Sequence, residues 1–147
     1  MPNEPSFANE TTFIDEVASL LISVGMAPIE ARINGLLFVS AKPLTLDRIA
    51  AALNISKSSA SVAARVLERH GVVRRYTEGG SKRLRYGISE RNFGFLFDQV
   101  AFLGSLGDLL RKRAMVSDGD EIAVRLENLG GFFERVSDAL EAALRTV

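Results

Sequence analysis

The sequence predicts a mainly α-helical fold with a small β component. Three observations lead to this prediction. Apolar residues recur at intervals of three and four over most of the chain, the interval changes to two only between residues 72 and 88, and a regular apolar repeat fills the last segment. With 147 residues, 47% of them hydrophobic, the chain suits one domain with a sizeable core or a small domain with an appendage.

Two helices are predicted near the start, after a polar tail over residues 1–11 that we expect to be disordered. The first covers residues 12–24, and Gly25 ends it. Its apolar face comprises Phe13, Ile14, Val17, Leu20, Leu21 and Val24. Pro28 suits the first position of the second helix, which ends before Pro43. Its buried stripe comprises Ile29, Ile33, Leu36 and Leu37.

The next segment predicts two short helices joined by a tight turn. Thr45 is the expected N-cap of the first, and Ser56 is the expected N-cap of the second. The second helix runs to His70, and Gly71 occupies the position after it that favours a left-handed residue. The first of these helices has a compact apolar stripe of Leu46, Ile49, Ala50 and Leu53.

A β-hairpin follows, because the apolar period changes to two. Its predicted strands are residues 72–77 and 82–88, joined by a turn that contains Gly79 and Gly80. The expected buried side comprises Val72, Leu84, Tyr86 and Ile88. Arg83 and Arg85 are then expected to face outward.

The last third predicts two long helices. Ser89 is the expected cap of the first, which runs to about Arg113 and buries Phe93, Leu96, Phe97 and Val100. Apolar residues of the second recur every 3.5 residues on average, which is typical of a coiled-coil or bundle seam. We predict a dimer interface at Ile122, Leu126, Leu129, Phe133, Val136 and Leu140. The alternative is that this seam packs against the preceding helix of the same chain.

The helix over residues 56–70 has two different faces when it is placed on a helical wheel. The side expected to face the core contains Ser59, Ala60, Ala63, Val66, Leu67 and His70. The opposite side contains Ser58, Ser61, Val62, Arg65 and Arg69. Small residues allow close approach, hydroxyls can donate to phosphates or base edges, and arginine can bind guanine edges or phosphate with two donors. This face is therefore suited to lie against a nucleic acid.

The charge distribution supports the same interpretation. Residues 42–91 contain eleven basic and four acidic residues, a net charge of +7, although the whole chain is neutral. A basic segment of this kind favours a polyanionic partner. The order of elements, with a basic hairpin after the second short helix, predicts a winged helix-turn-helix with a two-stranded wing and long flanking dimerisation helices. The predicted DNA-binding residues are Thr45, Ser56, Lys57, Ser58, Ser61, Val62, Arg65, Arg69, Lys82, Arg83 and Arg85.

The run from Ala31 to Tyr76, above all PLTLDRIAAALNISKSSAS followed by RVLERHGVV, resembles the GbsR branch of the MarR-type bacterial transcriptional regulators. The resemblance extends over residues 28–88. It implies a cytoplasmic homodimer that represses transcription, binds double-stranded operator DNA through residues 12–89 and dimerises through residues 90–147. It also implies a small-molecule effector, which is a quaternary amine in some such regulators. Amine cages favour Trp, and this sequence has none.

Other function classes find less support in the sequence. A winged-helix module that binds proteins instead of DNA is the main alternative, and the basic surface argues against it. No pairing of a nucleophile with a base, metal-ligand spacing or phosphate-binding loop is recognisable, so we expect neither an enzyme nor a bound cofactor or metal. The absence of cysteine excludes thiol chemistry. No apolar run is long enough to span a membrane.

Overall fold

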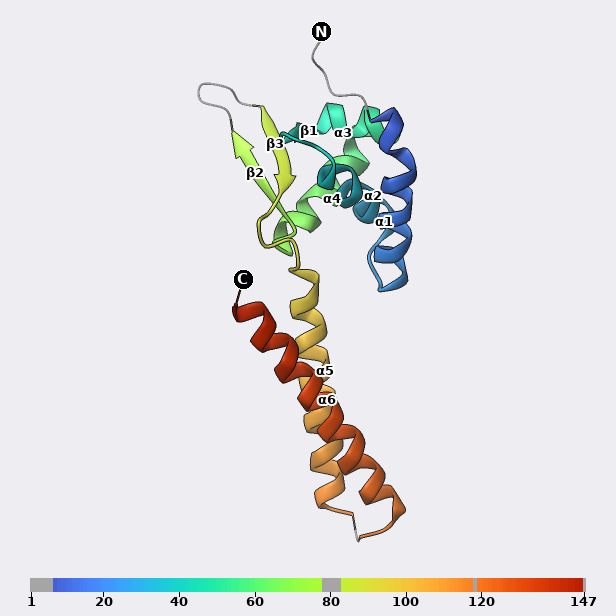
Figure 1. Ribbon diagram of the computed structural model, residues 1–147, viewed down its shortest axis with the longest axis vertical. Helices are drawn as coiled ribbons and strands as arrows, with labels where there is room; N and C mark the ends of the chain where they lie inside the picture. Colours follow the sequence, from blue (N-terminus) through green and yellow to red (C-terminus); the bar gives the residue numbers. More distant parts are fainter. Residues whose placement is uncertain (1–6, 78–82, 118, 147) are drawn as a thin grey trace. The chain divides into compact units, whose positions relative to one another are not determined.

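The structure is a computed structural model that describes residues 7–77, 83–117 and 119–146 (Figure 1). The chain divides into two compact units, Met1–Asn92 and Phe93–Val147. Each unit is described by itself below. No helix in the described ranges is both long and apolar enough to cross a membrane.

The N-terminal unit has the predicted helix-turn-helix and wing. Its elements, in chain order, are η1 (Ala8–Glu10), α1 (Thr11–Ser23), α2 (Pro28–Phe38), β1 (Leu44–Thr45), α3 (Leu46–Leu53), α4 (Lys57–Arg69), β2 (Val73–Thr77) and β3 (Leu84–Ile88). Both predicted glycine stops are confirmed, because Gly25 and Gly71 have φ values of +103° and +72°. Asn54, in the turn between α3 and α4, is also left-handed, with a φ of 55°. A short polar side chain tolerates this conformation better than most others.

The core of this unit forms where α2, α3, α4 and the wing meet. Figure 1 shows these elements packed together, with the two long strands beside α4. The largest side chains that are almost completely buried are Tyr86, Ile33, Leu36, Leu37, Ile49, Leu67, Val72 and Val73. A Cβ atom on Gly35 of α2 would lie 3.0 Å from the backbone oxygen of Ile14 in α1. The glycine therefore allows α1 to approach α2 closely.

The sheet has three strands in the order β1-β3-β2, and both pairings are antiparallel. The sequence predicted only β2 and β3, because a strand of two residues has too few positions to show a period. In the observed register, Arg85 of β3 lies opposite Thr45 of β1 and Tyr76 of β2. Since β3 is the central strand, Arg85 is half-buried, and the expectation that it faces fully outward is wrong.

The C-terminal unit is a pair of helices, α5 (Phe95–Met115) and α6 (Glu121–Arg145). Its close contact is made by small residues. A Cβ atom on Gly107 would lie 2.8 Å from the backbone oxygen of Gly130, and one on Gly130 would lie 2.9 Å from the oxygen of Gly107. Arg111 of α5 forms ion pairs with Glu127 and Glu134 of α6. The hydrogen bond to Glu134, followed by its negative charge, raises the pKa of Arg111 above its ordinary value.

The contact between the two helices changes the interpretation of the predicted seam. The buried residues of α6 are Gly130, Ser137 and Leu144. Of the predicted dimer residues, Leu126, Phe133, Val136 and Leu140 are half-buried, whereas Ile122 and Leu129 are 50% and 43% exposed. Part of the predicted stripe thus borders the intrachain contact, as the alternative anticipated, and part of it faces solvent.

Two further expectations about packing are wrong. Ser89 does not cap α5; its hydroxyl accepts a hydrogen bond from the backbone N–H of Arg91 (3.1 Å), and α5 begins only at Phe95. Phe97, expected in the core, is 47% exposed. The predicted apolar face of α1 is only partly buried. Ile14 and Ala18 are buried, whereas Phe13, Leu20 and Val24 are exposed.

Candidate nucleic-acid interface

The first turn of α4 is organised by the hydroxyl of Ser56. This oxygen accepts a hydrogen bond from the backbone N–H of Ser59 at 3.0 Å, which confirms Ser56 as the N-cap. The same hydroxyl donates to the hydroxyl of Ser59 at 2.8 Å and lies 3.2 Å from that of Ser58. The start of α4 therefore presents a cluster of hydroxyl groups at the end of the helix where backbone N–H groups are also available for an anion.

The two faces of α4 differ as the sequence predicted, with one exception. Its buried residues are Ala60, Ala63, Ala64 and Leu67. On the opposite side Ser58, Val62, Arg65 and Arg69 are exposed, and Ser61 is half-buried. His70 was expected on the core side but is exposed, because α4 ends at Arg69 and the chain turns away at the C-cap.

Arg65 is held in place by its own helix. Its Nη2 donates to the hydroxyl of Ser61 at 3.1 Å, and its Nε donates to the backbone oxygen of Ser61 at 3.3 Å. Both partners lie one turn earlier on the exposed side of α4. The guanidinium group is thus directed along the outer face of the helix and toward its N-terminal half.

Val62 is the only large apolar side chain on this outer face, and it is 59% exposed. It lies on the edge of a shallow depression of about 620 Å³ between α4 and the start of α2. The depression is lined by Ala27, Pro28, Ile29, Glu30, Ser58, Ser59, Val62 and Ala63. An exposed valine next to hydroxyl groups is suited to contact a thymine methyl group.

The preceding helix positions two of the predicted contact residues. Thr45 is the N-cap of α3, and its hydroxyl accepts from the backbone N–H of Arg48 at 3.2 Å. The ammonium group of Lys57 lies 3.2 Å from the carboxylate of Asp47. This ion pair connects α3 to the first residue of α4. Lys57 would therefore have to exchange or share this carboxylate in order to contact a phosphate.

The wing contributes cations from both long strands. Arg74 and Arg75 of β2 are exposed, as is Arg83 immediately before β3. The Nε of Arg75 lies 3.5 Å from a carboxylate oxygen of Glu68, so this arginine links β2 to the end of α4. Lys82, also predicted to bind DNA, lies outside the described residues.

Sequence reasoning missed two polar groups that hold this unit together. Arg32 of α2 donates to the backbone oxygen of Leu53, the last residue of α3, at 2.9 Å. Asn34 of α2 is completely buried, and its Oδ1 accepts from Nδ2 of Asn92 at 2.9 Å. The Nδ2 of Asn92 also donates to the backbone oxygen of Val72 at 2.6 Å. The sequence did contain a signal for the second of these groups, because Asn34 places a polar amide within the apolar stripe of α2.

The described residues contain no cluster of three or more His, Cys, Asp or Glu side chains that could hold a metal ion. The polar groups gathered at α4 and the wing are hydroxyls and cations. This composition is suited to binding phosphates and base edges.

Comparison with known proteins agrees with this geometry. Residues 25–84, which include α2, α3, α4 and β2, match the MarR family. A solved structure described as a transcriptional regulator is 20% identical, with a TM-score of 0.70 over 92% of this chain and 95% of the other.

Over residues 25–84 this chain is MarR-like. The predicted resemblance to the MarR-type regulators is thereby confirmed over these residues, and the solved structure shows the same fold. Assignment to the GbsR branch stays a prediction.

Two other solved structures are more distant. MepR, a transcription regulator of the Staphylococcus aureus multidrug efflux pump MepA, is 18% identical over 86% of this chain and 92% of its own, with a TM-score of 0.46. Streptococcus pneumoniae FabT, solved in complex with DNA, is 16% identical over 88% and 90%, with a TM-score of 0.39. None of the curated proteins matches the sequence.

Proposed function

We propose that this chain is a sequence-specific DNA-binding transcriptional regulator that acts as a cytoplasmic homodimer and represses transcription from a palindromic operator. In this proposal α4 enters the major groove and the wing contacts phosphates. Two copies would contact half-sites about one helical turn apart, roughly 34 Å. The chain acts by binding and has no catalytic role.

The observation that carries the proposal is the difference between the two faces of α4. One face is closed by buried alanines and Leu67, whereas the other leaves Ser58, Val62 and Arg65 exposed in one row. An ordinary solvent-facing helix surface would carry mainly Glu and Lys. Here the outer residues provide hydroxyl, methyl and guanidinium groups, which are the groups that distinguish base pairs in the major groove.

Exposed apolar side chains in both units support the proposal that the chain forms a homodimer. In the C-terminal unit these are Phe97, Phe102, Leu109, Met115, Val116, Ile122, Val124, Leu129 and Phe132. On α1, Phe13 and Leu20 are 44% and 71% exposed. Surfaces this apolar are typical of protein interfaces. Two-fold symmetry of the protein would match a palindromic site.

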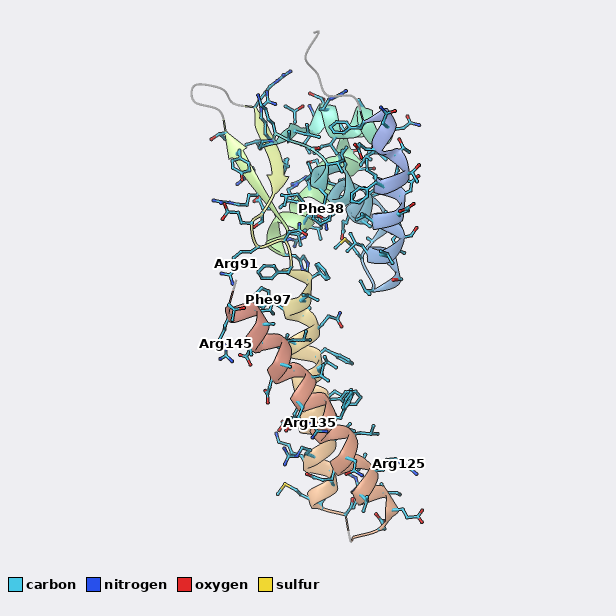
Figure 2. All side chains as sticks on the ribbon, in the orientation of Figure 1. Phe38, Arg91, Phe97, Arg125, Arg135 and Arg145 are labelled. Carbon is cyan, nitrogen blue, oxygen red and sulfur yellow. The ribbon has the colours of Figure 1, made fainter. Side chains whose placement is uncertain are left out.

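Arg65→Ala tests the assignment of α4 to base recognition. We expect binding to the selected operator to weaken by about 1–3 kcal/mol while binding to random duplex changes little. The operator is first obtained by selection from a random duplex library, and affinities are measured by fluorescence anisotropy at two salt concentrations. Arg135→Ala, at an exposed position of α6 labelled in Figure 2 and away from the Ile122–Leu129 side, removes the same charge and should leave both affinities unchanged.

The wing variant Arg83→Ala should behave differently. Since phosphate contacts carry no sequence information, it should weaken binding to operator and random duplex equally and reduce the salt dependence by about one counterion. Equal losses on both duplexes for Arg65→Ala would instead contradict base recognition by that residue. If the wild-type protein bound no duplex even at low salt, the proposal would fail in favour of a winged-helix module that binds proteins.

A further inference from the structure

A buried polar node lies inside the N-terminal unit, where three separate segments of the chain meet. It consists of the side chains of Asn34 and Asn92 and the backbone oxygen of Val72. The Nδ2 of Asn92 donates to the Oδ1 of Asn34 at 2.9 Å and to the oxygen of Val72 at 2.6 Å. Asn34 belongs to α2, Val72 lies between α4 and β2, and Asn92 follows β3. One side chain thus ties the segment after β3 to two other parts of the unit.

The polar groups of the node are incompletely satisfied. Asn34 is completely buried, and so are its neighbours in α2, Ile33 and Leu36. Among the described residues, the Nδ2 of Asn34 and the Oδ1 of Asn92 are buried without a hydrogen-bond partner. A buried polar atom without a partner costs free energy, and apolar groups of the same shape in place of both side chains would avoid this cost. Stability alone therefore does not explain two asparagines at these positions.

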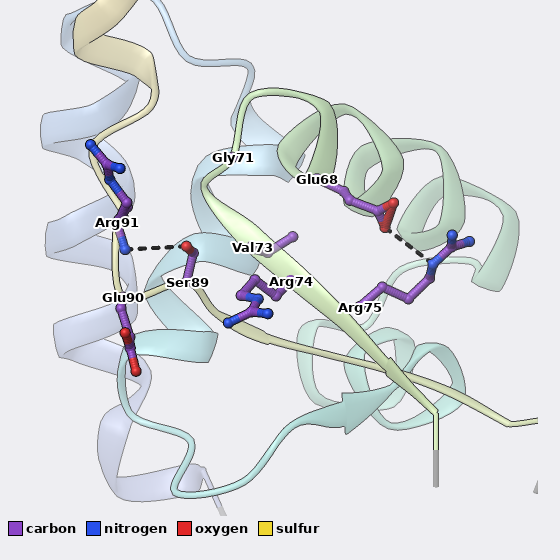
Figure 3. A pocket seen from close by; sticks show the side chains of 8 residues that line it. All are labelled: Glu68, Gly71, Val73, Arg74, Arg75, Ser89, Glu90 and Arg91. Carbon is purple, nitrogen blue, oxygen red and sulfur yellow. Dashed lines mark hydrogen bonds and ion pairs between the residues drawn. The ribbon is translucent and has the colours of Figure 1, made fainter. Parts of the chain in front are cut away.

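The node fixes the segment between β3 and α5. The N–H of Ser89 donates to the same oxygen of Val72 at 3.2 Å, and the hydroxyl of Ser89 accepts from the N–H of Arg91. Figure 3 shows this segment beside the start of β2, with the bond between Ser89 and Arg91 as a dashed line. The N–H of Val72 in turn donates to the backbone oxygen of Leu67 in α4 at 3.0 Å. Through Val72, the segment is tied to the end of α4.

The node lies immediately before the boundary between the two units. Asn92 is the last residue of the N-terminal unit, and only Phe93 and Gly94 separate it from the first residue of α5. A movement of Asn92 relative to α2 and Val72 would change the point at which the chain leaves the helix-turn-helix. In a dimer joined through its C-terminal helices, this point helps to set the distance between the two copies of α4.

We propose that Asn34 and Asn92 are positioning residues for operator recognition, because they restrict a dimer to one spacing between its two half-sites. The inference rests on the proposed function and extends it from the bases that α4 contacts to the distance between half-sites. One added base pair moves a half-site by about 3.4 Å and rotates it by roughly a tenth of a turn. A fixed segment after β3 makes both changes costly, whereas a loosened segment accommodates them. Retention of a buried polar group for a defined geometry at the expense of stability is attested in other proteins.

The test uses the double variant Asn34→Leu, Asn92→Leu in the full chain. Leucine has nearly the shape of asparagine, and both unpaired polar atoms are removed, so resistance to urea should be unchanged or higher. Fluorescence anisotropy measures affinity for the selected operator, for operators with the spacer two base pairs longer or shorter, and for a single half-site. A changed spacer should weaken wild-type binding by about tenfold or more and variant binding by less than about threefold. Affinity for the single half-site should be the same for both proteins.

A second measurement needs no DNA. Hydrogen exchange followed by NMR should show the amide of Ser89 exchanging about tenfold faster or more in the double variant, because Asn92 no longer holds the segment. Asn92→Ala, at a half-buried position, removes both hydrogen bonds without enlarging a side chain and should have the same two effects. Asn9→Leu, at an exposed position of η1, makes the same replacement away from the node and is the control. It should exchange and select spacers like the wild type.

Three results would overturn the inference and leave the proposed function intact. The first is a spacing preference in both node variants as strict as that of the wild type. The second is unchanged exchange at Ser89. The third is an equal loss of affinity for every duplex, including the single half-site, because the node would then only support the fold of the helix-turn-helix. Failure of the proposed function would appear in the wild type itself, as a lack of duplex binding or of any preferred spacing, and the inference would fail with it.

Discussion

The two units of this chain are stabilised in different ways. The N-terminal unit buries large side chains, among them Tyr86, Ile33 and Leu67. The described part of the C-terminal unit buries mainly small residues, such as Gly107 and Gly130, while its phenylalanines and leucines are largely exposed or half-buried. The first unit has the core of an independent domain. The second has two helices in close backbone contact whose apolar side chains still need a partner.

The difference explains where each unit tolerates change. A core of interlocked large side chains is sensitive to volume at many positions. In a helix pair that packs through glycines, larger side chains at the crossing should destabilise the pair, whereas substitutions beside the crossing should be tolerated. Substitutions on the outer surface should matter only if a second copy of the chain covers that surface. The predictions below separate these cases.

The largest effect is expected from charges on the exposed apolar side of α6. The double variant Ile122→Glu, Leu129→Glu should convert the proposed dimer to a monomer at micromolar concentrations, because two unpaired carboxylates buried in the interface would cost far more free energy than the interface can supply. Light scattering coupled to size exclusion would measure the mass. Arg135→Glu, at an exposed position on another side of α6, changes the net charge by the same amount and should remain dimeric. A double variant that remains dimeric would show that this side of α6 is not the interface.

A smaller effect is expected at the crossing of α5 and α6. Gly107→Ala should lower the free energy of unfolding by about 1–3 kcal/mol, because its Cβ would lie 2.8 Å from a backbone oxygen that cannot move independently. Gly131→Ala is the matched control. Its Cβ would meet only the flexible end of Arg135 at 3.3 Å, so the better helix propensity of alanine should stabilise the protein by up to about 1 kcal/mol. Urea denaturation would measure both, and a neutral Gly107→Ala would contradict the close crossing.

The smallest effect concerns the N-terminal unit. Ser56→Ala should destabilise the protein by about 1 kcal/mol, because the N–H of Ser59 loses its acceptor. Ser56→Asp should restore most of this loss, since a carboxylate also caps a helix. Ser58→Ala serves as the control, because its hydroxyl accepts no capping bond. Thermal unfolding would rank the three variants, and equal midpoints for Ser56→Ala and Ser58→Ala would refute the cap.

Much of the N-terminal unit could be predicted because its signals are local. Pro28, Thr45 and Ser56 mark helix starts, and Gly25 and Gly71 mark helix ends through backbone preferences that act within a few residues. The outer face of α4 follows from the same helical period, which correctly separated Arg65 from Ala60. The prediction that His70 faces the core was wrong because a helical wheel treats every residue as helical, whereas α4 ends at Arg69.

The features that could not be predicted depend on contacts between distant segments. Leu44 and Thr45 form β1 because they pair with β3. A strand of only two residues is too short to show an alternating apolar pattern in the sequence. The bond between Asn34 and Asn92 joins residues that are far apart in sequence. Ser89 was predicted to cap α5, but its hydroxyl accepts a hydrogen bond from the N–H of Arg91, two residues later in the chain. In α6, the apolar repeat predicted a seam but could not distinguish packing against α5 from packing against a second copy.

The hydrogen bonds between Arg65 and Ser61 have a thermodynamic consequence. A long side chain already fastened to its own helix has few rotamers left to lose when a duplex arrives. Contact by this guanidinium should therefore carry a small entropic penalty, and calorimetry of Ser61→Ala should show a less favourable binding entropy with a nearly compensating enthalpy. The hydroxyl of Ser61 would then lower the entropic cost of duplex binding by Arg65, in addition to any contact that Ser61 itself makes with the duplex.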